Sequence, residues 1–190
     1  MVVSGKLFSL ISCVTALCVY TNGDKDHVIL KRQSDWLSSV ENSLRNLKVD
    51  KTTIVVGKSG KIWLTDLQTT DYSSAKWHGE SQKDGLTYYK MRGSAMTMKA
   101  QADALTTGLA AWIVPTKAQA KNINVELERA AASVSDCKCS IGPVKVNLDQ
   151  LEGAGAATYQ KKKGAIQAAA KKNLQVAICS AAVKGLQQAI

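Results

Sequence analysis

The feature that most constrains this chain is the basic pair Lys31-Arg32, because it separates an N-terminal leader from the part that has to fold. Lys6 is followed by an uninterrupted run of apolar and small residues from Leu7 to Tyr20. Such a run is typical of a secretory signal peptide and is too short for a comfortable membrane span. We therefore predict a signal peptide over residues 1–23.

A short polar segment lies between the leader and the basic pair, which indicates proteolytic processing at that point. We predict a propeptide over residues 24–32, cleavage after Arg32, and a secreted, extracellular product that begins at Gln33. The remaining 158 of the 190 residues are enough for one domain with its own core, so a single domain is expected over 33–190.

The charge of the chain limits the kind of partner that it can have. It contains 25 lysine and arginine residues against 15 acidic ones, a net charge of +10. Cleavage after Arg32 removes four basic and two acidic side chains, which leaves +8. Because a basic secreted protein is attracted to anionic surfaces, we expect an anionic membrane or wall component of a target cell as partner, and no nucleic acid. Charge that only keeps the chain soluble is the alternative.

Three cysteines remain after processing, namely Cys137, Cys139 and Cys179. The secretory route is oxidising, so we predict one disulfide from Cys179 to either Cys137 or Cys139, and one thiol left over. The leftover thiol suggests a buried cysteine or pairing with another chain, and a homo-oligomer is possible. Three cysteines do not supply the four ligands of a closed zinc site, so neither a metal nor a cofactor is expected.

The N-terminal half of the mature chain reads as one helix followed by strands. An amphipathic helix is predicted over 34–47, because its apolar residues fall on one helical face. The β-rich runs 52–57 and 61–67 predict a hairpin. The polar stretch 68–84 is expected to be a loop, and 86–92 to be a strand.

The C-terminal half gives a mixed pattern. Helices are predicted over 95–114, where apolar residues recur at helical spacing before Pro115, and over 148–172. Strands are predicted over 137–147, with a bend at Gly142-Pro143, and over 174–181. Residues 116–134 fit either a helix or a strand.

These elements predict an α+β fold, a two-layer α/β sandwich with helices on one face of a sheet. If 116–134 is a strand, residues 86–181 have the βαββαβ order of a ferredoxin-like sandwich. On this interpretation residues 33–84 form a helix-plus-hairpin extension and residues 85–190 form the sandwich core.

The leader, the Lys31-Arg32 site, the basic composition and the order of elements resemble secreted fungal killer toxins. The salt-mediated yeast killer toxin and the toxins of smut fungi are the members to which the chain is most similar, together with related fungal effectors. The resemblance implies maturation by a kexin-type protease, an α/β sandwich, and action at the surface of competing cells. It carries over no functional residue.

The strongest charge feature is a group of lysines within the predicted helix 148–172. The group is Lys161, Lys162, Lys163, Lys171 and Lys172. Basic residues contribute up to about 1 kcal/mol each near an anionic surface, so these side chains are candidates for surface binding. A solvated helix face is the alternative.

A second group supplies the residue types of an acid–base nuclease. His78 and Glu80 could act as acid and base, Arg92 could bind a phosphate, and Tyr88 lies nearby in the sequence. Their spacing matches no known signature. Among the tryptophans, Trp77 is the one expected to be exposed.

We therefore expect a secreted, non-enzymatic toxin or effector that binds the surface or membrane of target cells. A secreted ribonuclease-like enzyme and a non-toxic, wall-associated structural protein are the alternatives.

Overall fold

Seven strands form one antiparallel sheet in the described part of the chain, which comprises residues 35–55, 60–106, 109–148 and 153–190 of a computed structural model. A helix at 35–45 precedes the sheet, and α2 (Gly153–Ala189) follows it. The strands are β1 (Lys48–Val55), β2 (Gly60–Ser73), β3 (Trp77–Lys83), β4 (Leu86–Thr106), β5 (Leu109–Ala130), β6 (Ser133–Ser140) and β7 (Val144–Asn147). The expected leader and processing site lie outside the described residues.

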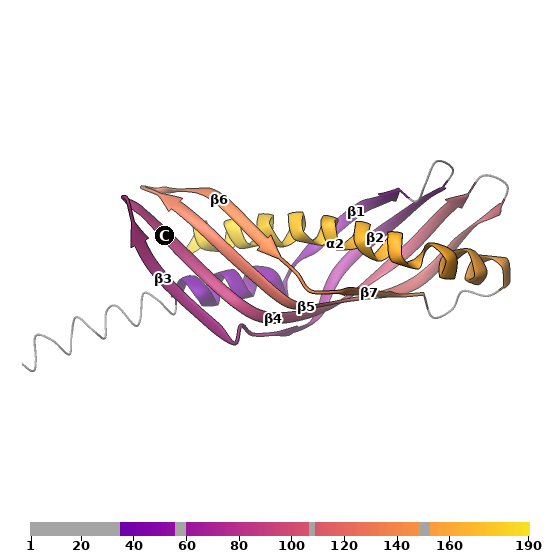
Figure 1. The fold of residues 1–190 in the computed structure, drawn as a ribbon, viewed down its shortest axis with the longest axis horizontal. Coiled ribbons are helices and arrows are strands. Elements are labelled where there is room, and N and C mark those ends of the chain that lie inside the picture. The colour runs from indigo at the N-terminus through magenta and orange to yellow at the C-terminus, as the bar shows by residue number, and fades with distance from the viewer. Residues whose placement is uncertain (1–34, 56–59, 107–108, 149–152) are drawn as a thin grey trace, which may run out of the picture. The chain divides into compact units, whose positions relative to one another are not determined.

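The two long strands β4 and β5 run through the middle of the sheet, and shorter strands follow one another along their outer sides. On the free side of β4, β2 pairs with its second half and β3 with its first half. On the free side of β5, β7 pairs with residues 117–120 and β6 pairs with residues 124–130. The remaining strand, β1, pairs with β2 and forms one edge (Figure 1).

The sheet bends near the middle of β4 and β5, where each strand contains an irregularity. Gly93 in β4 has a φ of 80°, and Asn122 in β5 has a φ of 51°. Each irregularity adds a residue, so the inward-facing positions change from odd to even along β4 and from even to odd along β5. The buried positions are Tyr89 and Met91, then Met96, Met98, Ala100 and Ala102 in β4, and Ala118 and Ala120, then Ile123, Val125 and Leu127 in β5.

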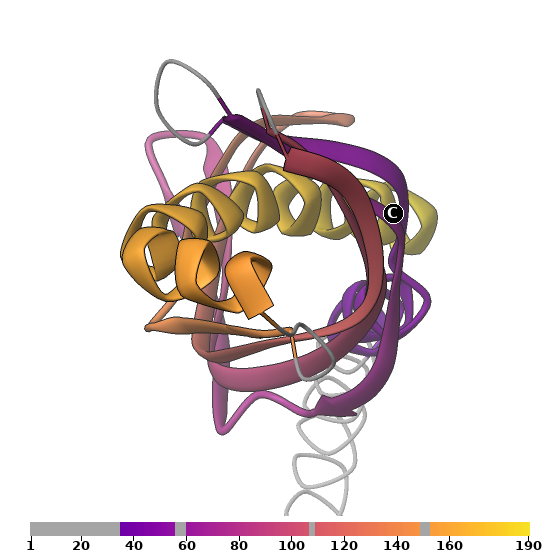
Figure 2. The same cartoon turned by 90° about the vertical axis from the view of Figure 1, so that its right-hand side faces the viewer.

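The sheet curls part of the way around α2, which lies against its concave face, and the core lies between them (Figure 2). From Ile166 onward every fourth residue of α2 is buried, in a stripe that consists of Ile166, Ala170, Leu174, Ile178, Ala182 and Leu186. The helix at 35–45 packs against the C-terminal part of α2, where the Ser39 hydroxyl donates to the carbonyl of Gly185 at 2.7 Å. An added Cβ on Gly185 would lie 2.7 Å from the Cα of Val40, so only glycine permits this approach.

Some of the sequence predictions are confirmed. The N-terminal helix forms at 35–45 and buries Trp36, Val40 and Leu44. The two β-rich runs predicted as a hairpin pair as β1 and β2. Residues 116–130 take the strand alternative, and the break between β6 and β7 spans the predicted bend at Gly142-Pro143.

The predicted fold class is wrong. The protein is neither a two-layer α/β sandwich nor ferredoxin-like over 86–181. Residues 95–106 and 109–114 of the predicted helix belong to β4 and β5, and the predicted strand 174–181 belongs to α2. The polar stretch 68–84 is mostly strand. In the described part of the predicted helix-plus-hairpin extension, β1 pairs with β2, and β2 also pairs with β4 in the same sheet.

Candidate functional site

A surface groove of about 770 Å³ lies between α2 and residues 42–49, and we call it the α2 groove. One wall comes from residues between 42 and 49, which end the first helix and begin β1. The other wall comes from a stripe of α2 between residues 173 and 188. A volume of this size is within the range of small-molecule sites.

The α2 groove is amphipathic. Its apolar side chains include Leu47, Val49 and Val176. Val176 is 64% exposed, which is unusual for a large aliphatic side chain on a helix that otherwise packs on a sheet. Its charged side chains are Lys48 and Lys184, and none of the described acidic residues lines it. The groove therefore offers both an apolar surface and positive charge to a ligand.

An apolar space, the inner crevice, lies between α2 and the concave face of the sheet. It is lined by Val49, Leu64, Leu67, Ala118, Ala170, Asn173, Leu174 and Ala177. Three of these residues, Val49, Asn173 and Ala177, also line the α2 groove. The inner crevice has room for about 20 Å³, so an acyl chain can occupy it only if α2 moves away from β1.

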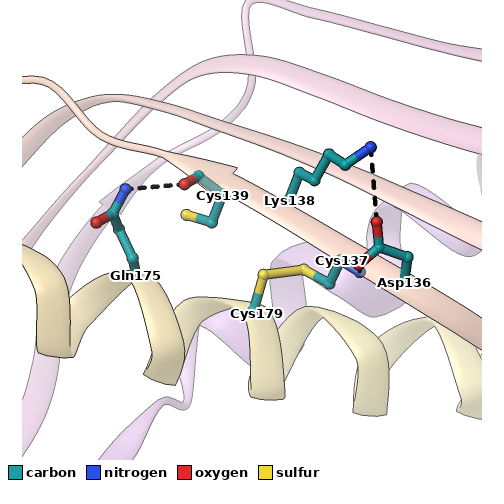
Figure 3. Close-up of a disulfide and its surroundings, with 6 residues drawn as sticks. All are labelled: Asp136, Cys137, Lys138, Cys139, Gln175 and Cys179. Atoms are coloured by element: carbon teal, nitrogen blue, oxygen red, sulfur yellow. Dashed lines mark hydrogen bonds and ion pairs between the residues drawn. A yellow bond between two sulfur atoms is a disulfide. The ribbon is translucent and has the colours of Figure 1, made fainter.

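On the opposite edge of the sheet, a disulfide joins α2 to β6 (Figure 3). Cys137 and Cys179 have Cα atoms 5.8 Å apart and form the bond, which is one of the two predicted pairings. One turn earlier on α2, the side-chain amide of Gln175 donates to the carbonyl of Cys139 at 2.9 Å. The helix α2 is thus attached to the sheet at β6, whereas the α2 groove lies between α2 and the start of β1.

Cys139 is the free thiol among the described residues. Burial raises the pKa of Cys139 to about 11. The thiol therefore stays protonated at neutral pH, and since the thiolate is the reactive form, Cys139 is not suited to nucleophilic chemistry. The described part of the chain holds no cluster of three or more side chains suited to bind a metal ion.

The residues proposed for nuclease chemistry do not meet in one site. His78 is paired with Met91, and it lies on the core side of β3, where its ring is 6.2 Å from that of Trp36. Arg92 is paired with Trp77 and stacks over its ring at 5.2 Å. Because neighbouring residues of a strand point to opposite faces, His78 and Arg92 lie on different sides of the sheet.

The predicted surface-binding lysines lie on α2 but outside the α2 groove. Lys161, Lys162, Lys163 and Lys172 are exposed, and Lys171 is half-buried. Their role in binding an anionic surface stays a prediction. Trp77 is 50% exposed, as expected. Among the described residues, neither helix combines the length and hydropathy needed to cross a membrane.

Comparisons with known proteins identify the fold. No protein-family model matches the chain, and no curated protein matches its sequence. Among solved structures, it is similar to a lipopolysaccharide binding protein, with a TM-score of 0.59 and 11% identity over 82% of this chain. It is also similar to Takeout 1 of Epiphyas postvittana, with a TM-score of 0.52 and 12% identity over 76% of this chain and 78% of that one. The chain spans 37% of the length of the lipopolysaccharide binding protein.

Proposed function

We propose that this protein binds an amphipathic lipid, with the head group in the α2 groove and the acyl chain directed into the inner crevice. The observation that carries the proposal is the continuity of the two spaces, which share Val49, Asn173 and Ala177. A solvent-facing groove that leads to an apolar space suits a ligand with one polar end and one apolar end.

Two further observations support the proposal. The exposed Val176 lies in the α2 groove, where the part of the acyl chain next to the head group would cover it on its way to the inner crevice and remove its apolar surface from water. The similar solved structures include one that is described as a lipopolysaccharide binding protein. The predicted secretion of the chain is compatible with carrying a lipid between aqueous compartments.

The test is titration of the purified protein with a fluorescent fatty-acid analogue. Ala177→Phe places a ring where the α2 groove meets the inner crevice, and it should weaken binding at least tenfold. Val176→Glu places a charge in the groove at an exposed position, so it should weaken binding without affecting folding.

Ala168→Phe is the matched control, because Ala168 is exposed on α2 and lines neither space. It should bind like the unaltered protein. Circular dichroism and thermal melting of each variant establish that the fold is intact. Absence of saturable binding by the unaltered protein, or equal binding by all the variants, would contradict the proposal.

The toxin or effector role and maturation by a kexin-type protease remain proposals that rest on the sequence. Lipid binding is compatible with action at a target membrane, where the ligand would be extracted or delivered. Growth inhibition by the purified secreted product, compared with that by Ala177→Phe, would link the two activities.

A further inference from the structure

The charges of the α2 groove point to the class of lipid, an inference that rests on the proposed function. Thirteen residues line the groove, and its ionisable side chains are Lys48 and Lys184. Neither lysine forms an ion pair with another described residue. In the first helix, the carboxylate of Glu41 is engaged elsewhere, since it accepts hydrogen bonds from the Ser74 hydroxyl and the Ala75 backbone amide.

The two lysines take different positions in the groove. Lys184 belongs to the stripe of α2 that forms one wall, which also includes Ala177 and Ala181. Lys48 is the first residue of the edge strand β1, on the opposite wall. A ligand in the groove would therefore lie between two positive charges that come from separate elements.

The distance along α2 separates the polar end of the site from the apolar end. Ala177 lines the inner crevice, and Lys184 is seven residues further along the helix. At a rise of 1.5 Å per residue, they are about 10 Å apart along the helix axis. A single-chain lipid whose apolar tail enters near Ala177 would thus have its head group close to Lys184.

We infer that the α2 groove selects a lipid with an anionic head group, a carboxylate or a phosphate, through Lys184 and Lys48. An exposed lysine can also serve only to keep a protein in solution, so the test compares ligands of equal chain length and different charge.

The experiment measures displacement of the fluorescent analogue by hexadecanoate, hexadecyl phosphate and hexadecanol, each below its aggregation concentration. We expect the unaltered protein to bind the two anions about tenfold more tightly than the alcohol, since a partly exposed ion pair contributes up to about fivefold for each lysine. Lys48→Gln/Lys184→Gln should remove this preference and leave affinity for the alcohol unchanged. Comparison of the two anions distinguishes a carboxylate from a phosphate head group.

Lys161→Gln/Lys162→Gln is the charge-matched control, because both lysines are exposed on α2 and lie outside the groove. It should keep the preference for anions. Equal affinity for alcohol and anions, or a preference that survives Lys48→Gln/Lys184→Gln, would overturn the inference and leave lipid binding intact. If none of the three ligands displaces the analogue, both the inference and the proposed function fail.

Discussion

The disulfide between Cys137 and Cys179 should provide a large part of the stability of this fold. It joins β6 to α2 across 42 residues of sequence. In the chain-entropy model, a cross-link that closes a loop of this length restricts the unfolded chain and stabilises the folded one by about 4 kcal/mol. In a domain of this size, the loss of about 4 kcal/mol on removal of the bond should lower the melting temperature by roughly 10 °C.

The perturbation is Cys137→Ala/Cys179→Ala, made in a Cys139→Ala background. The background is needed because Cys139 lies two residues from Cys137 on β6 and could form a replacement bond with Cys179. Urea unfolding followed by circular dichroism gives the free energy of unfolding of each protein. We expect the double substitution to lower it by about 4 kcal/mol relative to the Cys139→Ala parent.

Reduction of the Cys139→Ala parent provides an independent control, since it breaks the same bond without changing the sequence. It should give the same loss of stability as the double substitution. A loss below about 1 kcal/mol in both experiments would refute the reasoning, because the bond would then not restrain the unfolded chain.

Three further predictions concern packing, hydrogen bonding and pH. Gly185→Ala should lower the free energy of unfolding by about 2 kcal/mol, because the Cβ of the alanine would overlap the backbone of Val40. Unchanged unfolding in urea would exclude this close packing. Glu41→Ala should lower the free energy of unfolding by about 1–2 kcal/mol, since the Ala75 amide loses its acceptor, and Glu41→Gln should have a smaller effect. Equal losses in the two variants would contradict this role of Glu41. Because burial raises the pKa of Cys139, its thiol should react with iodoacetamide at pH 8 about two orders of magnitude more slowly than a free cysteine, and rapid alkylation of folded protein would count against this. The free energy of unfolding should also fall as pH rises above about 8.5, since only the unfolded chain then releases the thiol proton.

Local patterns predicted the elements that depend on local sequence. The helix at 35–45 has one continuous apolar face, and the β1–β2 hairpin joins two β-rich runs that are close in sequence. Both could be predicted because their backbone hydrogen bonds join residues that are near in the sequence, four apart in a helix and between Lys48↔Gln68 and Val55↔Lys61 in the hairpin. The disulfide was limited to two pairings for a different reason, since only three cysteines follow the leader.

The long strands could not be predicted, because their alternation changes phase. In β4 the buried positions are odd-numbered before Gly93 and even-numbered after it, so no single two-residue pattern covers the strand. Met98 and Ala102, which suggested a helix, are also four residues apart on one face of a strand. The decisive information is the pairing of β4 with β5, which is a tertiary property.

The C-terminal part of α2 was missed because its composition resembles that of a strand. Residues 174–181 contain several β-favouring residues, and the four-residue recurrence of Leu174, Ile178, Ala182 and Leu186 was the signal for a helix. The α2 groove had no comparable signal, since it arises where residues 42–49 meet residues 173–188. Such a site becomes visible only when the fold is known.

The most direct test of lipid binding in this protein is photo-crosslinking with a fatty acid that carries a diazirine near the end of its acyl chain. Peptide mass spectrometry then locates the labelled residues. The proposal predicts labelling of the walls of the inner crevice, at Val49 and around Ala177, and loss of that labelling in Ala177→Phe. Labelling confined to the outer face, for example around Trp77, or labelling unchanged in Ala177→Phe would contradict it.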